Sequence, residues 1–140
     1  MFLKGKFRIL LSVLAIAVLC TATVSASASR ASRYIDWYSM DVLRAGSGKL
    51  GIEFSIEGTG KMTAIGAESI VVYRQSGSTW VYDGEYDRYD AGMTDSNTAK
   101  HGNTIYYQGV SGVKYKVTVT VFAENSTGSD SRTENFILTA

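Results

Sequence analysis

The sequence has 140 residues, with 14 Lys and Arg, 13 Asp and Glu, one His, one Cys and no Pro. The near-neutral charge and the 45% hydrophobic content argue against a disordered chain, and the length suffices for one domain with a hydrophobic core. A net charge of only +1 also excludes the strongly basic surface by which proteins bind nucleic acid.

The first 28 residues have the order of a secretory signal peptide. Three basic residues precede the apolar run Ile9 to Leu19, and the small residues Thr21 to Ala28 follow it. An apolar run of about 11 residues is too short for a membrane span, which needs about 20. We therefore expect a secreted protein that meets the membrane only transiently, through its signal peptide.

Cleavage is expected after Ala28, with Ala26 as the alternative site. An uncleaved anchor and a lipid attached to Cys20 are the other readings of this segment. Cleavage after Ala28 removes the single Cys and three basic residues, which leaves 11 basic residues against 13 acidic ones in residues 29–140. The mature chain is then a slightly acidic domain without disulfides, which is more usual for bacterial exported proteins than for small secreted animal domains.

Within residues 29–140, apolar and polar side chains alternate with period two between turns rich in Gly, Ser and Asn. Seven such segments predict one all-β domain, an antiparallel β-sandwich of about seven strands over residues 32–140. Loops are predicted at Met62 to Ala67 and at Arg88 to Lys100, and Gly58 to Gly60 is predicted to be a turn. The predicted strands are Tyr34 to Leu43, Leu50 to Glu57, Ser69 to Gln75, Thr79 to Tyr86, Asn103 to Gly109, Lys114 to Val121 and Thr133 to Thr139.

The segments Ser111 to Val119 and Ala123 to Ser129 resemble the end of a fibronectin type III or immunoglobulin-like domain. In such domains a Tyr near the start of the penultimate strand makes a corner hydrogen bond. The resemblance implies that Tyr115 is this residue and that Asn125 and Gly128 lie in the last hairpin. It covers about 25 residues and implies an immunoglobulin- or fibronectin-like sandwich.

Further segments along the mature chain resemble a family of small exported proteins from Gram-positive, clostridia-like bacteria whose function is not characterised. This resemblance implies export and a sandwich fold, and it carries no site residues. The matching segments are Ser32 to Ile35, Gly58 to Gly60, Ile65 to Ala67, Ser69 to Tyr73, Trp80 and Gly128 to Thr133.

No catalytic residue and no cofactor is expected. The single histidine, His101, stands beside a Gly before a predicted strand and is expected to be a solvated loop residue. One His without a Cys does not make a zinc site, and no Gly-x-Ser-x-Gly motif is present. The acids Asp83, Asp87 and Asp90 are weak candidates for calcium, an ion that prefers oxygen ligands. Asp83, Glu85 and Asp87 alternate with period two, however, and this spacing also fits the solvated face of a strand.

Aromatic residues around the long predicted loop are the expected binding surface, because such side chains stack on sugars and supply rigid contact area at protein interfaces. Trp80, Tyr82 and Tyr86 are predicted to share one face of their strand, although core packing is an alternative role for them. Tyr106 and Tyr107 are adjacent and must face opposite ways. The candidate residues are Trp80, Tyr82, Tyr86, Tyr89 and Tyr107.

These observations favour a secreted, non-catalytic binding module for a protein or carbohydrate ligand at the cell surface or in a host. A structural or adhesive accessory domain that self-associates through exposed strand edges is the alternative, and a small secreted hydrolase is the third hypothesis. No nucleic-acid partner is expected. The fold by itself does not choose among these functions.

Overall fold

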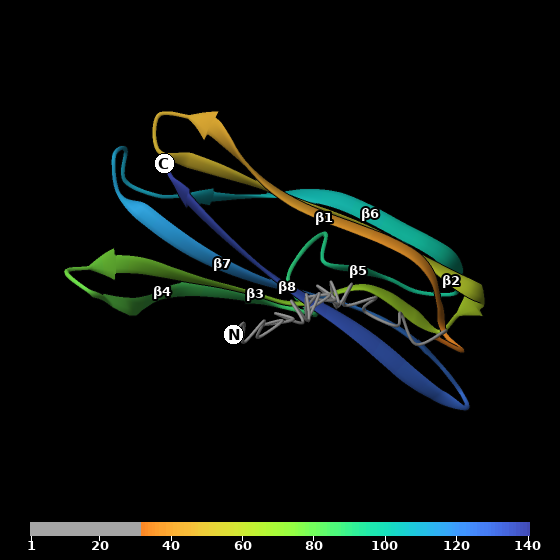
Figure 1. Ribbon diagram of the computed structural model, residues 1–140. Coiled ribbons are helices and arrows are strands. Elements are labelled where there is room, and N and C mark those ends of the chain that lie inside the picture. The colour runs from red at the N-terminus through yellow and green to blue at the C-terminus, as the bar shows by residue number, and fades with distance from the viewer. Residues whose placement is uncertain (1–31) are drawn as a thin grey trace, which may run out of the picture.

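The computed structural model describes residues 32–140, which form eight strands in two antiparallel sheets packed face to face (Figure 1). Sheet A has the order β1-β2-β6 and sheet B the order β4-β3-β7-β8, while the short β5 pairs with β3. Sheet A consists of β1 (Ile35–Gly46), β2 (Lys49–Met62) and β6 (Thr98–Gln108). Sheet B consists of β4 (Thr79–Asp87), β3 (Ala64–Ser76), β7 (Lys114–Asn125), β8 (Gly128–Thr139) and β5 (Thr94–Asp95).

The predicted all-β antiparallel sandwich is confirmed, with eight strands instead of about seven because β5 was not expected. No helix that could cross a membrane occurs among residues 32–140. The expected signal peptide, residues 1–28, lies outside the described residues.

The core lies between the sheets and follows the period-two pattern of the sequence. On β2 and β7 the apolar member of each pair is buried, and β3 contributes further aliphatic side chains from the same side. Burial of these apolar surfaces is the main force that holds the two sheets together. The central buried side chains are Leu50, Ile52, Phe54, Ile56, Ile70, Val72, Tyr115, Val117, Val119 and Val121.

The loop predicted at Met62 to Ala67 is wrong, because β2 ends at Met62 and β3 begins at Ala64. The chain passes directly from one sheet to the other, with Met62 and Ile65 both buried. The predicted turn at Gly58 to Gly60 is instead an irregularity within β2, where the pairing with β6 shifts. Bulges of this kind let a strand bend across the corner of a sandwich, which explains the glycines.

The segment predicted as a long loop, Arg88 to Lys100, contains β5 and the first residues of β6. Met93 fills the interior with no exposed surface, and its carbonyl oxygen accepts a hydrogen bond from the N–H of Ala67 at 2.8 Å. Gly66 has a φ of 147°, and a Cβ there would lie 2.2 Å from the Met93 oxygen. The segment therefore packs onto β3 at a point that only glycine permits.

Tyr115 makes a hydrogen bond of the kind that the resemblance to immunoglobulin-like domains implied. It is the second residue of β7, its ring is buried, and its hydroxyl oxygen accepts the N–H of Val110 at 2.7 Å. Residue 109 is a glycine beside this ring, and any larger residue would be too close to it, because a Cβ there would lie 2.9 Å from the ring. The hydrogen bond fixes the connection from β6 to β7, while assignment to the immunoglobulin or fibronectin class stays a prediction.

We expect Tyr115→Phe to lower the free energy of unfolding by about 1 to 2 kcal/mol, because the Val110 N–H loses its partner while the ring still fills the core. Urea denaturation followed by tryptophan fluorescence measures the change. Tyr89→Phe, which removes a hydroxyl from a side chain that is 87% exposed, serves as the control and should be neutral. Equal stability of the two variants would contradict the assigned role of the Tyr115 hydroxyl.

Candidate functional site

The aromatic residues predicted as one binding patch are split by a bulge in β4. Val72 pairs with Gly84 and Tyr73 pairs with Tyr82, so Asp83 is an extra residue in the β4 ladder. The extra residue inverts the alternation of side chains. Trp80 and Tyr82 therefore share the outer face of sheet B with Tyr73, whereas Tyr86 packs against the core. The prediction that Trp80, Tyr82 and Tyr86 share a face is wrong for this reason.

Tyr86 and Tyr107 close the side of the sandwich between β4 and β6. Their rings meet edge to face with centroids 6.5 Å apart, and Tyr107 meets Tyr115 in the same way at 6.3 Å. The Tyr86 hydroxyl donates to the Tyr106 carbonyl oxygen at 2.9 Å, and the Tyr107 hydroxyl donates to the carboxylate of Asp83. These two tyrosines join the sheets and leave no shared binding patch with Trp80 and Tyr82.

The three acids named as calcium candidates are engaged in separate local contacts. The Asp83 carboxylate accepts the Tyr107 hydroxyl and lies 3.5 Å from the Arg74 guanidinium. Asp87 accepts the N–H of Tyr89 and Asp90 accepts the N–H of Asp87, each at 2.8 Å, so both shape the loop after β4. Among residues 32–140 no group of three or more His, Cys, Asp or Glu residues is placed to hold a metal ion.

His101 is a strand residue of β6, so its prediction as a solvated loop residue is wrong. Its ring lies 5.7 Å from the Phe54 ring, and its Nε2 donates to the Gly92 carbonyl oxygen at 2.9 Å. Asn103 donates to the same oxygen at 3.0 Å. Both side chains thus tie the loop after β4 to sheet A, which gives His101 and Asn103 a structural role.

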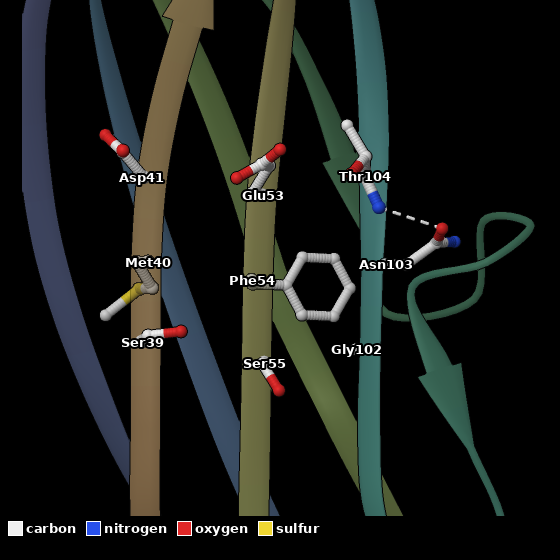
Figure 2. Close-up of a pocket in the computed structure, with 9 residues that line it drawn as sticks. All are labelled: Ser39, Met40, Asp41, Glu53, Phe54, Ser55, Gly102, Asn103 and Thr104. Atoms are coloured by element: carbon white, nitrogen blue, oxygen red, sulfur yellow. Dashed lines mark hydrogen bonds between the residues drawn. The ribbon is translucent and has the colours of Figure 1, made fainter.

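The outer face of sheet A contains a hollow of about 710 Å³. Its outward-facing residues form two rows that cross the three strands (Figure 2). Asp41, Glu53 and Thr104 form one row, and Ser39, Ser55 and Gly102 form the next. We call this depression the sheet A hollow. The residues that line it are Ser39, Met40, Asp41, Glu53, Phe54, Ser55, Gly102, Asn103 and Thr104.

Gly102 is the residue that opens the sheet A hollow. It lies inside β6, is exposed, and has no positive φ, so its backbone does not require glycine. A Cβ there would lie 3.1 Å from the Ser55 hydroxyl. Glycine weakens a strand interior and often marks a place where a ligand comes close to the backbone. Gly51 differs, because it is buried and a Cβ there would meet the Tyr106 ring at 3.6 Å.

Exposed aromatic side chains stand on either side of the hollow. Trp37 is 51% exposed and stands two residues before Ser39 on β1, while Tyr106 is 58% exposed and stands two residues after Thr104 on β6. Their rows are six residues apart on β1, or about 20 Å at roughly 3.4 Å per residue. Along β1 the outer face therefore presents first an aromatic ring, then the hydroxyls and carboxylates of the hollow, and then a second aromatic ring.

Two carboxylates lie side by side in the hollow. Asp41 is the direct cross-strand partner of Glu53, and within residues 32–140 neither forms an ion pair. Like charges in this position destabilise an antiparallel pair. Glu57, one row beyond Ser55, is instead the partner of Lys100.

The sequence showed these polar residues only as the solvated side of their strands. Glu53 and Ser55 were recognised as alternating with buried residues, but their neighbours Asp41, Gly102 and Thr104 lie far away in the chain. Gly102 gave no signal either, because it stands next to Asn103 between a predicted loop and a predicted strand, and only the structure places it inside β6.

No family model and no characterised protein matches this chain. A solved structure that does match is the superoxide reductase from Nanoarchaeum equitans, at 12% sequence identity and a TM-score of 0.33. The match covers 71% of this chain and 90% of that chain. A likeness at this level carries no argument about function, so the function must be inferred from the geometry.

Burial and the hydrogen bond to Asp83 raise the pKa of the Tyr107 hydroxyl above its ordinary value. A raised folded-state pKa means that the neutral phenol stabilises the fold. This contribution is complete below about pH 10 and is lost as the pH rises toward the folded-state pKa. We expect the unfolding free energy to fall above pH 10 and to fall less steeply in Tyr107→Phe, as measured by urea denaturation at stepped pH. Tyr89→Phe should keep the wild-type slope, and identical slopes in both variants would refute the assignment.

We expect Glu53→Gln to raise the unfolding free energy by about 0.2 to 1 kcal/mol at low salt, because it removes the repulsion from Asp41. The matched control is Glu57→Gln, which faces Lys100 and should not be stabilising. The gain should disappear in about 1 M NaCl, where the screening length is about 3 Å. A gain that persists in high salt would show that repulsion is not its cause.

Proposed function

We propose that the protein is an exported, non-catalytic binding module whose ligand is a glycan, held on the outer face of sheet A. The observation that carries this proposal is the sheet A hollow, a polar depression opened by Gly102. A flat two-layer sandwich has no structural need for a depression on a solvated face. Its polar lining suits a ligand that is itself polar on every side.

The groups in the hollow match the chemistry of a sugar. Asp41 and Glu53 accept hydrogen bonds, while the hydroxyls of Ser39, Ser55 and Thr104 can both donate and accept. Sugar hydroxyls also do both, so a pyranose above Gly102 would find partners in both rows. Trp37 offers apolar ring surface to the C–H face of a sugar on one side of the hollow. On the other side Tyr106 is also exposed, and the Lys49 ammonium, 5.7 Å from its ring centroid, can donate to sugar hydroxyls.

The placement of the two carboxylates supports binding in preference to hydrolysis. Glycoside hydrolysis by a carboxylate pair requires the two groups to flank the scissile bond. Asp41 and Glu53 instead project from the same face of adjacent strands, side by side (Figure 2). A glycan lying on this face has both carboxylates beneath it.

The start of the described fold is compatible with the proposed export. Ser32 accepts hydrogen bonds from the N–H groups of Tyr34 and Ile35, at 3.0 and 2.8 Å, and so anchors the entry to β1. Removal of residues 1–28 leaves every residue of the sandwich in place. Secretion would bring the sheet A hollow into contact with glycans outside the cell.

The proposal predicts binding of a neutral oligosaccharide, first selected on a glycan array and then measured by isothermal titration calorimetry with the mature protein. Trp37→Ala and Tyr106→Ala should each weaken the affinity about tenfold or more, as expected for central aromatic contacts. Tyr82→Ala, on the opposite sheet, is the matched control and should bind as the wild type does.

Gly102→Ala separates binding from folding. The new Cβ fills the floor of the hollow, 3.1 Å from the Ser55 hydroxyl and 3.2 Å from the Phe54 carbonyl oxygen, so binding should fall at temperatures where a melting curve shows the variant to be folded. The proposal fails if no glycan binds, or if Gly102→Ala and Tyr82→Ala affect binding equally.

A further inference from the structure

We infer that the outer face of sheet B is a second docking surface, and that its occupant is an acidic segment of another protein. This surface lies on the opposite side of the sandwich from the sheet A hollow (Figure 1). The inference rests on different residues from the glycan proposal and can stand or fall without it.

One row of this surface crosses all four long strands. Tyr82 of β4 pairs with Tyr73 of β3, Tyr73 pairs with Lys116 of β7, and Lys116 pairs with Ile137 of β8. Tyr82 is 56% exposed and Ile137 is 58% exposed, and Trp80 lies beside the row on β4. We call these five residues the sheet B row. The two ends of the row are thus exposed, while Tyr73, Lys116 and Trp80 between and beside them are half-buried.

Two lysines of this surface, Lys114 and Lys116, have no carboxylate partner within the described part of the chain. The Lys116 ammonium lies 4.6 Å from the Tyr73 ring centroid and 5.6 Å from that of Trp80. Lys114 stands on the same face of β7, two residues before it. No ion pair within residues 32–140 includes either lysine. An acidic partner would complement both charges beside the apolar row.

The acids of this face are already engaged. Partial burial and the nearby Glu85 carboxylate raise the pKa of the Tyr82 hydroxyl. Glu68 and Glu124 hold the Arg88 guanidinium, at 3.7 and 3.3 Å, above the buried ring of Phe122. None of these three acids pairs with Lys114 or Lys116. The two lysines therefore form a positive region that is separate from the acids of this face.

The geometry of the rings favours a protein over an acidic glycan. Lys116 occupies a face of Tyr73 and of Trp80, and the Tyr73 and Tyr82 planes cross at 82°. Sugar rings would therefore find no open, coplanar platform. Ring edges, a Trp and an aliphatic side chain are the composition of well-packed protein interfaces.

The charges on the two outer faces determine which face an acidic partner would bind. Asp41 and Glu53 would repel it from the sheet A hollow, while Lys114 and Lys116 attract it to sheet B. The two surfaces can thus be occupied at the same time, which would make the protein a bridge between a glycan and a second protein.

The test uses the mature protein and a labelled random copolymer of Glu and Tyr, followed by fluorescence anisotropy. Lys116→Glu and Tyr82→Ala should each weaken binding about tenfold, since they remove a charge and an aromatic anchor from the sheet B row. Lys49→Glu is the matched control, because Lys49 also lies over a tyrosine ring, 5.7 Å from Tyr106, but on sheet A. Melting curves establish that each variant is folded, and Lys116→Gln provides a milder second variant.

Polyglutamate and hyaluronate distinguish the alternatives. The inference is supported if the Glu-Tyr copolymer binds more tightly than both and loses affinity in the two sheet B variants only. It is overturned if the copolymer does not bind, if hyaluronate binds at least as tightly, or if Lys49→Glu weakens binding as much as Lys116→Glu. Loss of glycan binding in the sheet A variants should leave copolymer binding unchanged.

Discussion

The surfaces of this protein depend on the burial of one side-chain row on each of β2, β3 and β7. Because alternate residues of a strand face opposite ways, burying Ile52 and Phe54 fixes Glu53 and Ser55 on the outer face. The same constraint places Lys116 and Thr118 outside once Val117 is buried. A slip of one residue would exchange the two sets, so the core also determines the position of every candidate contact.

The sides of the sandwich are less available to partners than its faces. Between β4 and β6, Tyr86 and Tyr107 span the gap, and the Asp83 bulge interrupts the free edge of β4. The free edge of β8 has Asp130 and Arg132 on its inner side, paired at 2.9 Å. Bulges and inward charges are features that oppose pairing of edge strands between molecules. Partners are therefore expected on the two outer faces.

The sequence predicted those features that depend on a residue and its near neighbours. Alternation in Leu50 to Glu57 and Lys114 to Val121 was sufficient for the core and the fold class, whereas the hydrogen bond of Tyr115 was expected from the resemblance to immunoglobulin-like domains and not from the alternation. The Asp83 bulge was not predictable, because it arises where β3 and β4 meet. Asp41 and Glu53 became neighbours only through strand register, which tertiary packing sets.

The two outer faces differ in how their polar groups relate to the fold. On sheet A, Gly102 and the Asp41–Glu53 pair each act against strand stability, and within residues 32–140 neither acid has an ion-pair partner, although the Asp41 carboxylate accepts the N–H of Val42 at 2.8 Å. On sheet B, Lys116 covers apolar rings and so protects them from water, at the expense of an unpaired charge. A ligand on the first face would relieve an unfavourable arrangement, whereas a partner on the second would cover the exposed side chains of Tyr82 and Ile137 and pair with the lysine charge. Binding on sheet A should thus be sensitive to small changes in the floor of the hollow, and binding on sheet B should depend mainly on charge and aromatic area.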